Sequence, residues 1–297
     1  MRNIISWIKI IRINNVLLSF LGVLVGSAVA SETDLSNLPI LVVNTIFLSV
    51  PALAVAAGGY IANDYFDLEI DRISKPWRPL ARGDINPVTA RRVSVFLYAF
   101  SVAYSLLLIG LATSLFVILN VFIVDSYNSR FKRSGFIGNL LVSLATANLF
   151  IYGSLSYAER IIGLKNLSVM VLVPYTFAFL LTLVREIIKG VEDIEGDRRL
   201  GVRTLATTLG YRRSGLIATI LNLIILSLLT IPFLYRSSYM YLILALLTVI
   251  LSLYASYIIL TSRSETEAIK RSVNARSVTK LSLLTGVLAF LLWALKI

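Results

Sequence analysis

The chain alternates between long apolar stretches and shorter polar segments, and this pattern is the first guide to its fold. A helix that crosses a membrane needs about 20 mostly apolar residues, and we find nine such stretches. They cover residues 14–31, 40–64, 90–111, 113–128, 138–157, 166–188, 213–234, 239–261 and 279–295. The pattern therefore predicts an all-α, polytopic membrane protein, a bundle of nine transmembrane helices.

The polar segments between these stretches are too short to form a soluble domain. Residues 1–13 place Arg2, Lys9 and Arg12 among apolar residues, which is typical of an amphipathic helix at the membrane surface. The first half of one long helix is the alternative interpretation. Residues 262–278 are expected to be a polar connector. We predict a single transmembrane domain over residues 1–297.

Composition supports a membrane protein and narrows its chemistry. Hydrophobic residues make up 57% of the chain and charged residues 15%, and the mean hydropathy is +0.83. A water-soluble domain has roughly 25% charged residues. The sequence contains no Cys and no His, which excludes zinc sites, disulfides and catalysis by a Cys or a Ser–His pair. Any metal must be held by oxygen, as Mg²⁺, Ca²⁺ and Mn²⁺ are.

The basic residues are distributed unevenly along the chain. Of the 28 Lys and Arg residues, 24 fall in the N-terminal segment or after the second, fourth, sixth and eighth stretches. Cytoplasmic segments of membrane proteins carry such an excess. The distribution predicts a multi-pass protein of the cell membrane with its N-terminus in the cytoplasm.

Nine of the sixteen acidic residues fall in two short segments, both on the predicted cytoplasmic side. The first segment contains Asp64, Asp67, Glu69 and Asp71. We call Asn63, Asp64, Asp67 and Asp71 the first acidic cluster; the spacing places Asn63, Asp67 and Asp71 on one helical face. The second acidic cluster contains Glu186, Glu192, Asp193, Glu195 and Asp197, with Asp193 and Asp197 one turn apart. Carboxylates gathered at a membrane boundary need a cation, and Mg²⁺ suits oxygen ligands. A solvated surface, or ion pairs with neighbouring arginines, is the alternative.

Basic residues follow both clusters. Arg72, Lys75 and Arg78 follow the first, and Tyr127 and Lys132 stand near the end of the fourth stretch. Mg²⁺ held by carboxylates, together with Lys and Arg, is typical of a site for a diphosphate. The general excess of positive charge on this side would also explain these basic residues.

The motif Asn63-Asp64-x-x-Asp67-x-x-x-Asp71, with Asp193 and Asp197 after the sixth stretch, resembles the UbiA superfamily of intramembrane prenyltransferases. The sequence segments around these motifs, residues 63–67 and 185–197, are similar to those of the archaeal digeranylgeranylglyceryl phosphate synthases. The resemblance implies transfer of a geranylgeranyl group from geranylgeranyl diphosphate to geranylgeranylglyceryl phosphate. It also implies a prenyl diphosphate and a lipid-like acceptor as partners, in a bilayer and without nucleic acid.

The resemblance assigns roles to matching positions. Asn63, Asp67 and Asp71 would hold one Mg²⁺, and Asp193 and Asp197 a second. The catalytic residues would be Asp67, Asp71, Asp193, Asp197 and Lys132. The substrate-binding residues would be Arg12, Asn63, Asp64, Arg72, Lys75, Arg78, Tyr127, Lys132 and Glu186. Loops 67–89 and 189–212 would cap the active site.

One position departs from the family, and other functions remain open. Gly190 stands where we expect many relatives to carry Asp, so Glu186 or Asp193 would have to compensate. An aromatic prenyltransferase of quinone or haem biosynthesis is one alternative. A transporter is another, although it would place ionisable residues nearer the middle of the spans. The Asp-Gly and Ala-Arg signature of a CDP-alcohol phosphotransferase is absent.

Overall fold

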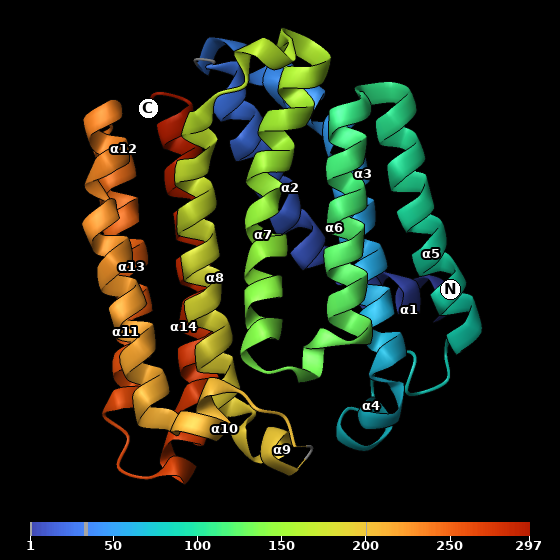
Figure 1. The fold of residues 1–297 in the computed structure, drawn as a ribbon, viewed down its shortest axis with the longest axis vertical. Helices are drawn as coiled ribbons and strands as arrows, with labels where there is room; N and C mark the ends of the chain where they lie inside the picture. The colour runs from blue at the N-terminus through green and yellow to red at the C-terminus, as the bar shows by residue number, and fades with distance from the viewer. Residues whose placement is uncertain (1, 33–34, 200) are drawn as a thin grey trace. The chain divides into compact units, whose positions relative to one another are not determined.

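A computed structural model describes residues 2–32, 35–199 and 201–297 (Figure 1). These residues form helices and no β-strand. The α-helices are α1 (Arg2–Ile11), α2 (Ile13–Ser31), α3 (Leu38–Phe66), α4 (Leu68–Ser74), α5 (Pro87–Tyr104), α6 (Leu111–Ser129), α7 (Phe136–Tyr157), α8 (Leu172–Glu192), α9 (Ile194–Arg199), α10 (Leu205–Leu209), α11 (Tyr211–Leu228), α12 (Thr230–Tyr235), α13 (Tyr239–Leu260) and α14 (Glu265–Ala294). Short 3₁₀ or π segments are η1 (Leu35–Asn37), η2 (Ser105–Ile109), η3 (Phe131–Arg133), η4 (Ala158–Ile162), η5 (Leu164–Asn166) and η6 (Val169–Val171).

Nine helical segments within the described ranges are long and apolar enough to cross a membrane. They are Ile13–Ser31, Leu35–Phe66, Pro87–Ile109, Leu111–Ser129, Phe136–Ile162, Val169–Glu192, Tyr211–Tyr235, Tyr239–Leu260 and Glu265–Ala294. The predicted fold class, all-α with nine spanning helices, is confirmed.

The prediction of a polar connector over residues 262–278 is wrong, because helix α14 begins at Glu265. The Ser264 hydroxyl caps this helix by accepting a hydrogen bond from the Glu267 backbone nitrogen at 3.2 Å. Two acidic residues in the first turn favour the start further. Hydropathy detects only the apolar second half of this helix, from about residue 279, so the prediction left out the polar first half.

The chain divides into two compact units, which are described separately. Unit 1 contains Met1–Ser31, Pro39–Ser129 and Leu149–Ser168; unit 2 contains Glu32–Leu38, Arg130–Asn148 and Val169–Ile297. Helix α7 contributes its first part to unit 2 and its second part to unit 1.

In unit 1, helices α5 and α6 pack closely on α3 at a pair of glycines. A Cβ atom at Gly58 would lie 2.8 Å from the Tyr98 ring, and one at Gly59 would lie 2.6 Å from Val124 Cγ1. The Ser94 hydroxyl donates to the Gly58 carbonyl at 2.9 Å. The glycines therefore allow two neighbouring helices to approach α3 just before the first acidic cluster.

The N-terminal segment of unit 1 is a separate helix. Helix α1 ends at Ile11, Arg12 has a left-handed backbone with φ 57°, and α2 begins at Ile13. Ile10 is fully buried, whereas Ile4 and Ile8 are exposed, which gives α1 its amphipathic character. The alternative of one long continuous helix is wrong, because the chain turns at Arg12.

In unit 2, helix α8 lies beside α11 and α14 (Figure 1). Buried Ile187 and Val191 of α8 belong to one apolar core with Ala218 of α11 and Ile259 of α13. An ion pair of 2.8 Å between Arg198 and Glu265 joins α9 to the start of α14. This packing fixes the end of α8, where the second acidic cluster lies.

Candidate active site

The first acidic cluster lies where helix α3 passes into α4. Asp67, between the two helices, has φ −88° and ψ −1°, and the helical hydrogen bonds continue through it. The Asp67 nitrogen donates to the Asn63 carbonyl at 3.0 Å, and the Asp71 nitrogen to the Asp67 carbonyl at 2.8 Å. The backbone therefore places Asn63, Asp67 and Asp71 on successive turns of one helical face.

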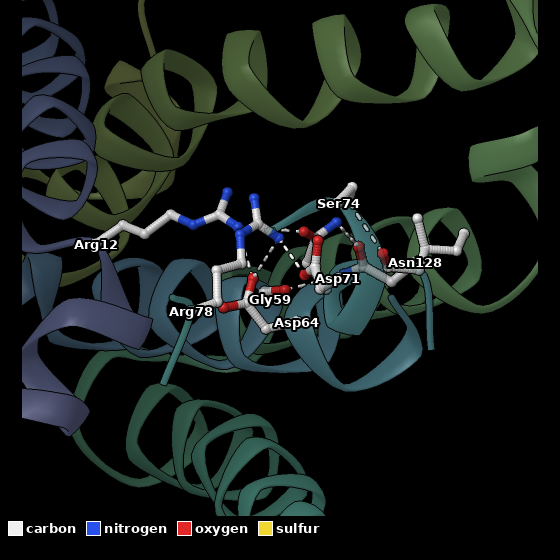
Figure 2. Close-up of polar contacts among 9 residues, drawn as sticks. Arg12, Gly59, Asp64, Asp71, Ser74, Arg78 and Asn128 are labelled. Atoms are coloured by element: carbon white, nitrogen blue, oxygen red, sulfur yellow. Dashed lines mark hydrogen bonds and ion pairs between the residues drawn. The ribbon is translucent and has the colours of Figure 1, made fainter. Parts of the chain in front are cut away.

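Two arginines hold the buried carboxylates of this cluster (Figure 2). Asp64 and Asp71 are each 3% exposed. Arg78 Nη1 lies 2.5 Å from Asp71 Oδ2 and 3.3 Å from Asp64 Oδ1, and Arg12 Nη2 lies 2.6 Å from Asp64 Oδ1. An unpaired buried carboxylate is costly by several kcal/mol, and the two guanidinium groups offset this cost by pairing with both carboxylates.

The two arginines come from segments outside α3 and α4. Arg12 stands at the turn between α1 and α2, and its guanidinium also lies 5.2 Å from the centre of the Tyr60 ring. Arg78 lies in the turns after α4, where its backbone nitrogen donates to the Lys75 carbonyl at 3.0 Å. The turn between α1 and α2 and the turns after α4 therefore each contribute one arginine to the cluster.

Asn63 is held from the other side by helix α6. Its Nδ2 atom donates to Asn128 Oδ1 at 3.1 Å, and Asn128 Nδ2 donates to the Gly59 carbonyl at 3.0 Å. Arg12 Nη2 lies 3.3 Å from Asn63 Oδ1. The Asn63 side chain is therefore connected to α6 by its nitrogen and to an arginine by its oxygen.

A further ion pair joins α5 to α6 next to the cluster. Arg91 Nη1 and Nη2 lie 2.7 Å and 3.2 Å from the two Asp125 oxygens. The same guanidinium lies 5.2 Å from the centre of the Phe66 ring at the end of α3. This bidentate pair fixes the three helix ends around Phe66.

The other predicted residues of unit 1 have different surroundings. Arg72 pairs at 2.9 Å with Glu69, and both side chains are exposed. Lys75 is exposed, and Tyr127 on α6 is half-buried. In the described contacts, Arg72 therefore pairs with Glu69 and not with Asp64 or Asp71, which Arg12 and Arg78 hold. Lys132 belongs to unit 2, in segment η3, and is half-buried.

In the second acidic cluster, the residues differ in their partners. Glu186 is 4% exposed, and its two oxygens lie 2.6 Å from Arg185 Nη1 and 3.1 Å from Lys189 Nζ. The Asp193 nitrogen donates to the Lys189 carbonyl at 3.0 Å, and the Asp197 nitrogen to the Asp193 carbonyl at 2.8 Å. Asp193 and Asp197 therefore lie one helical turn apart, as their spacing predicts.

Gly190 stands at an open position. A Cβ atom there would come no closer than 3.9 Å to Thr204, so a side chain would fit and the glycine is not required by packing. Both oxygens of Glu186 already pair with basic residues, whereas Asp193 is exposed. Of the two residues expected to compensate for Gly190, Asp193 is therefore the better placed.

The donor atoms suit Mg²⁺. In the described part of the chain, no three acidic residues gather into a group that could bind a metal by themselves. Asn63, Asp67 and Asp71 instead offer one amide and two carboxylates on one helical face. Mg²⁺ usually retains several waters and binds only one or two protein carboxylates together with substrate phosphates. The residues therefore fit a magnesium ion that a phosphate ligand shares.

The pKa of Asp197 makes the second cluster sensitive to pH. Burial, followed by the charge of Asp193, raises the Asp197 pKa from 3.8 to about 6. Because the raised pKa favours the protonated form, this group stabilises the metal-free fold at low pH, and the contribution is lost as the pH rises through about 6.

If Asp197 holds Mg²⁺, as the resemblance implies, Mg²⁺ binding should show the same titration with the opposite sign, because a proton on Asp197 would compete with the metal. We expect the Mg²⁺ affinity of the protein, measured by calorimetric titration, to fall as the pH is lowered from about 7 to about 5. Asp197→Asn should bind Mg²⁺ more weakly and with a flatter pH profile over this range. An unchanged slope in this variant would show that Asp197 is not the titrating group.

Three contributors to these clusters were missed by sequence reasoning: Asn128, the Arg91–Asp125 pair and Arg185. Polar residues inside an apolar span were the available signal, because such residues are costly in a membrane and need partners. Asn128 and Asp125 both carry this signal at the end of the fourth stretch. The identity of their partners depends on which helices pack together, which the sequence does not show.

Known proteins resemble this chain over most of its length. Residues 19–284 match the UbiA prenyltransferase family. The chain is 36% identical over 291 residues to the digeranylgeranylglyceryl phosphate synthase of Saccharolobus solfataricus, covering 98% of this chain and 97% of that protein.

Solved structures share the fold. One, from work on digeranylgeranylglyceryl phosphate synthase in membranes, is 26% identical with a TM-score of 0.76 and covers 100% of both chains. A UbiA homolog from Archaeoglobus fulgidus bound to GPP and Mg²⁺ is 18% identical with a TM-score of 0.63, covering 96% of this chain and 99% of that one. The fold, the acidic motifs and the full-length similarity agree, and the chain belongs to the UbiA prenyltransferase family.

Proposed function

We propose that this protein transfers a geranylgeranyl group from geranylgeranyl diphosphate to geranylgeranylglyceryl phosphate in archaeal ether-lipid synthesis. The observation that carries the proposal is the 36% identity, over 98% of the chain, to a digeranylgeranylglyceryl phosphate synthase. The first acidic cluster supports it, because its oxygen donors and two arginines are the groups that bind a metal and a diphosphate.

Two magnesium ions serve this reaction in our proposal. Asn63, Asp67 and Asp71 hold one, and Asp193 and Asp197 hold the other. The solved UbiA homolog that contains GPP and Mg²⁺ supports a divalent metal and a prenyl diphosphate as ligands. When bound, Mg²⁺ neutralises negative charge on the diphosphate as it leaves.

The chain's own cations complete the diphosphate site in this proposal. Arg12 and Arg78 already lie at the first acidic cluster, so they need only exchange a carboxylate partner for a phosphate oxygen. Lys132 and Arg72 are the further basic residues assigned to the diphosphate. Glu186 acts through its contacts with Arg185 and Lys189. Asp64, Lys75 and Tyr127 complete the predicted substrate-binding set.

The reaction breaks the allylic carbon–oxygen bond of the donor, and both bonding electrons leave with the diphosphate. The acceptor hydroxyl oxygen forms the new carbon–oxygen bond and releases its proton. Tyr65 and Phe66, at the end of α3, can stabilise the allylic cation through their ring faces. The positive-inside distribution favours a site that faces the cytoplasm, with the prenyl chain in the apolar part of the membrane.

Purified protein incubated with Mg²⁺, geranylgeranyl diphosphate and separate acceptors tests this function. We expect diphosphate release and ether product with geranylgeranylglyceryl phosphate, detected by mass spectrometry. Product with 4-hydroxybenzoate alone would reassign the protein to aromatic prenyl transfer. The absence of diphosphate release with every acceptor would contradict prenyl transfer itself.

A further inference from the structure

The polar contacts around Asn63 have a fixed direction. The Gly59 carbonyl can only accept, so the Asn128 atom 3.0 Å from it must be the amide nitrogen. Asn128 Oδ1 then accepts from Asn63 Nδ2 at 3.1 Å, which turns Asn63 Oδ1 toward Arg12 at 3.3 Å. Arg12 can only donate, so both ends of the chain of contacts require the same orientation of the two amides.

The fold holds Asn128 firmly enough to impose this orientation. Asn128 is 6% exposed and lies one helical turn after Val124 on α6. A Cβ atom at Gly59 would lie only 2.6 Å from Val124 Cγ1, so α6 reaches the Gly59 carbonyl because residue 59 has no side chain. Asn128 thus contacts two positions of α3 that are four residues apart.

We propose that Asn128 is a positioning residue, which fixes the Asn63 amide so that its oxygen faces Arg12 and is available to the proposed Mg²⁺. A primary amide has an oxygen on one side and an NH₂ group on the other, and only the oxygen binds a metal or accepts from an arginine. Without Asn128, the Asn63 amide keeps only the 3.3 Å contact with Arg12 to orient it, and it rotates more readily to present its NH₂ group. This inference rests on the proposed function, because it takes Asn63 as a magnesium ligand.

Two substitutions at position 128 separate positioning from packing. Asn128→Leu keeps a side chain that branches at Cγ and removes both hydrogen bonds. The Asn63 amide then loses the contact that orients its nitrogen. Asn128→Asp is isosteric and still presents an oxygen to Asn63 Nδ2, whether the carboxyl group is protonated or ionised. Positioning therefore predicts that Leu impairs magnesium binding more than Asp does. A packing role predicts the reverse, because a buried carboxyl group next to a carbonyl is less favourable than an apolar side chain.

The readout is the rise in unfolding temperature that Mg²⁺ and inorganic diphosphate produce together, with the Mg²⁺ concentration for half-maximal turnover as a second measure. We expect Asn128→Leu to raise the required Mg²⁺ concentration about 10-fold or more, the scale of lost ligand-orienting contacts. Asn128→Asp should stay near the parent protein. Ser129→Ala is the control, since the exposed Ser129 hydroxyl donates to the Asp125 carbonyl of its own helix and to no other group in the described part of the chain.

A double variant tests the mechanism directly. Asn63→Asp places an oxygen on both sides of residue 63, so its orientation no longer matters. Adding Asn128→Leu to Asn63→Asp should therefore raise the Mg²⁺ requirement by much less than it does in the parent protein. Equal effects in the two backgrounds would overturn the proposal, as would an unaffected Asn128→Leu. If Asp67→Asn were also fully active and bound Mg²⁺ normally, the magnesium site itself, and not the role of Asn128, would be the part that fails.

Discussion

Replacing Asp67 by Asn is expected to lower turnover about 100-fold or more, the effect of removing one strong electrostatic contact from a transition state. Asp67 lies at the junction of α3 and α4, one turn from Asn63 and one turn from Asp71. It is therefore the middle donor of the proposed magnesium face. The change keeps the size of the side chain and removes its charge. Initial rates of diphosphate release over a range of Mg²⁺ concentrations measure the effect.

Glu69→Gln is the matched control for Asp67→Asn. Glu69 is two residues away on α4, its side chain is 82% exposed, and it pairs with the exposed Arg72. The same loss of charge at this position should leave turnover within about twofold of the parent protein, since exposed ion pairs contribute little free energy. Asp197→Asn should resemble Asp67→Asn. Near-normal rates in both Asp variants would contradict the two-ion proposal.

Replacing Arg78 by Met is expected to destabilise the protein by about 3 kcal/mol, because it leaves buried carboxylates without a partner. Arg78 contacts both Asp64 and Asp71, each 3% exposed, whereas Arg12 pairs with Asp64 and not with Asp71 in the described contacts. Asp71 thus loses its ion pair with Arg78, while Asp64 keeps its ion pair with Arg12. The unfolding temperature of the detergent-solubilised protein measures the change, and added Mg²⁺ should recover part of the loss.

Two further variants show whether the loss in Arg78→Met comes from uncompensated charge. Arg72→Met removes a similar side chain from an exposed pair and should change the unfolding temperature little. Asp71→Asn combined with Arg78→Met removes the carboxylate that was left alone. The double variant should be more stable than Arg78→Met. If it were less stable, Arg78 would stabilise the fold through packing rather than through its charge.

Much of this architecture could be predicted from the sequence, because length and periodicity determine it. An apolar stretch long enough to span a membrane has to be helical, since every backbone group needs an internal partner there. The spacing of Asn63, Asp67 and Asp71 gives one helical face even though α3 formally ends at Phe66, because the backbone hydrogen bonds continue. The nine helices and this face therefore followed from local pattern.

Arg12 and Arg78 were among the predicted site residues, but the contacts that each partner of the cluster makes could not be predicted in the same way. Arg78 lies seven residues from Asp71, but Arg12 is 52 residues from Asp64, and Asn128 is 65 from Asn63. Such pairs depend on the path of the turns and on which helices pack together. The start of α14 was missed for another reason: its polar first half has no hydrophobic signal, and a serine cap is a weak one. The sequence thus pointed to the acidic residues and to Arg12 and Arg78, but not to which of these residues pair with one another.

The position of Arg12 connects the N-terminal helix to the first acidic cluster. A chain shortened to begin at Ile13 would keep every helix that is long enough to span the membrane, and hydropathy would describe it as intact. It would nevertheless lack one of the two cations that hold Asp64. It would also lack Ser6, whose hydroxyl donates to Asp84 at 2.9 Å, in the turns that carry Arg78. The first dozen residues are therefore a poor place to trim, and an affinity tag belongs at the other end.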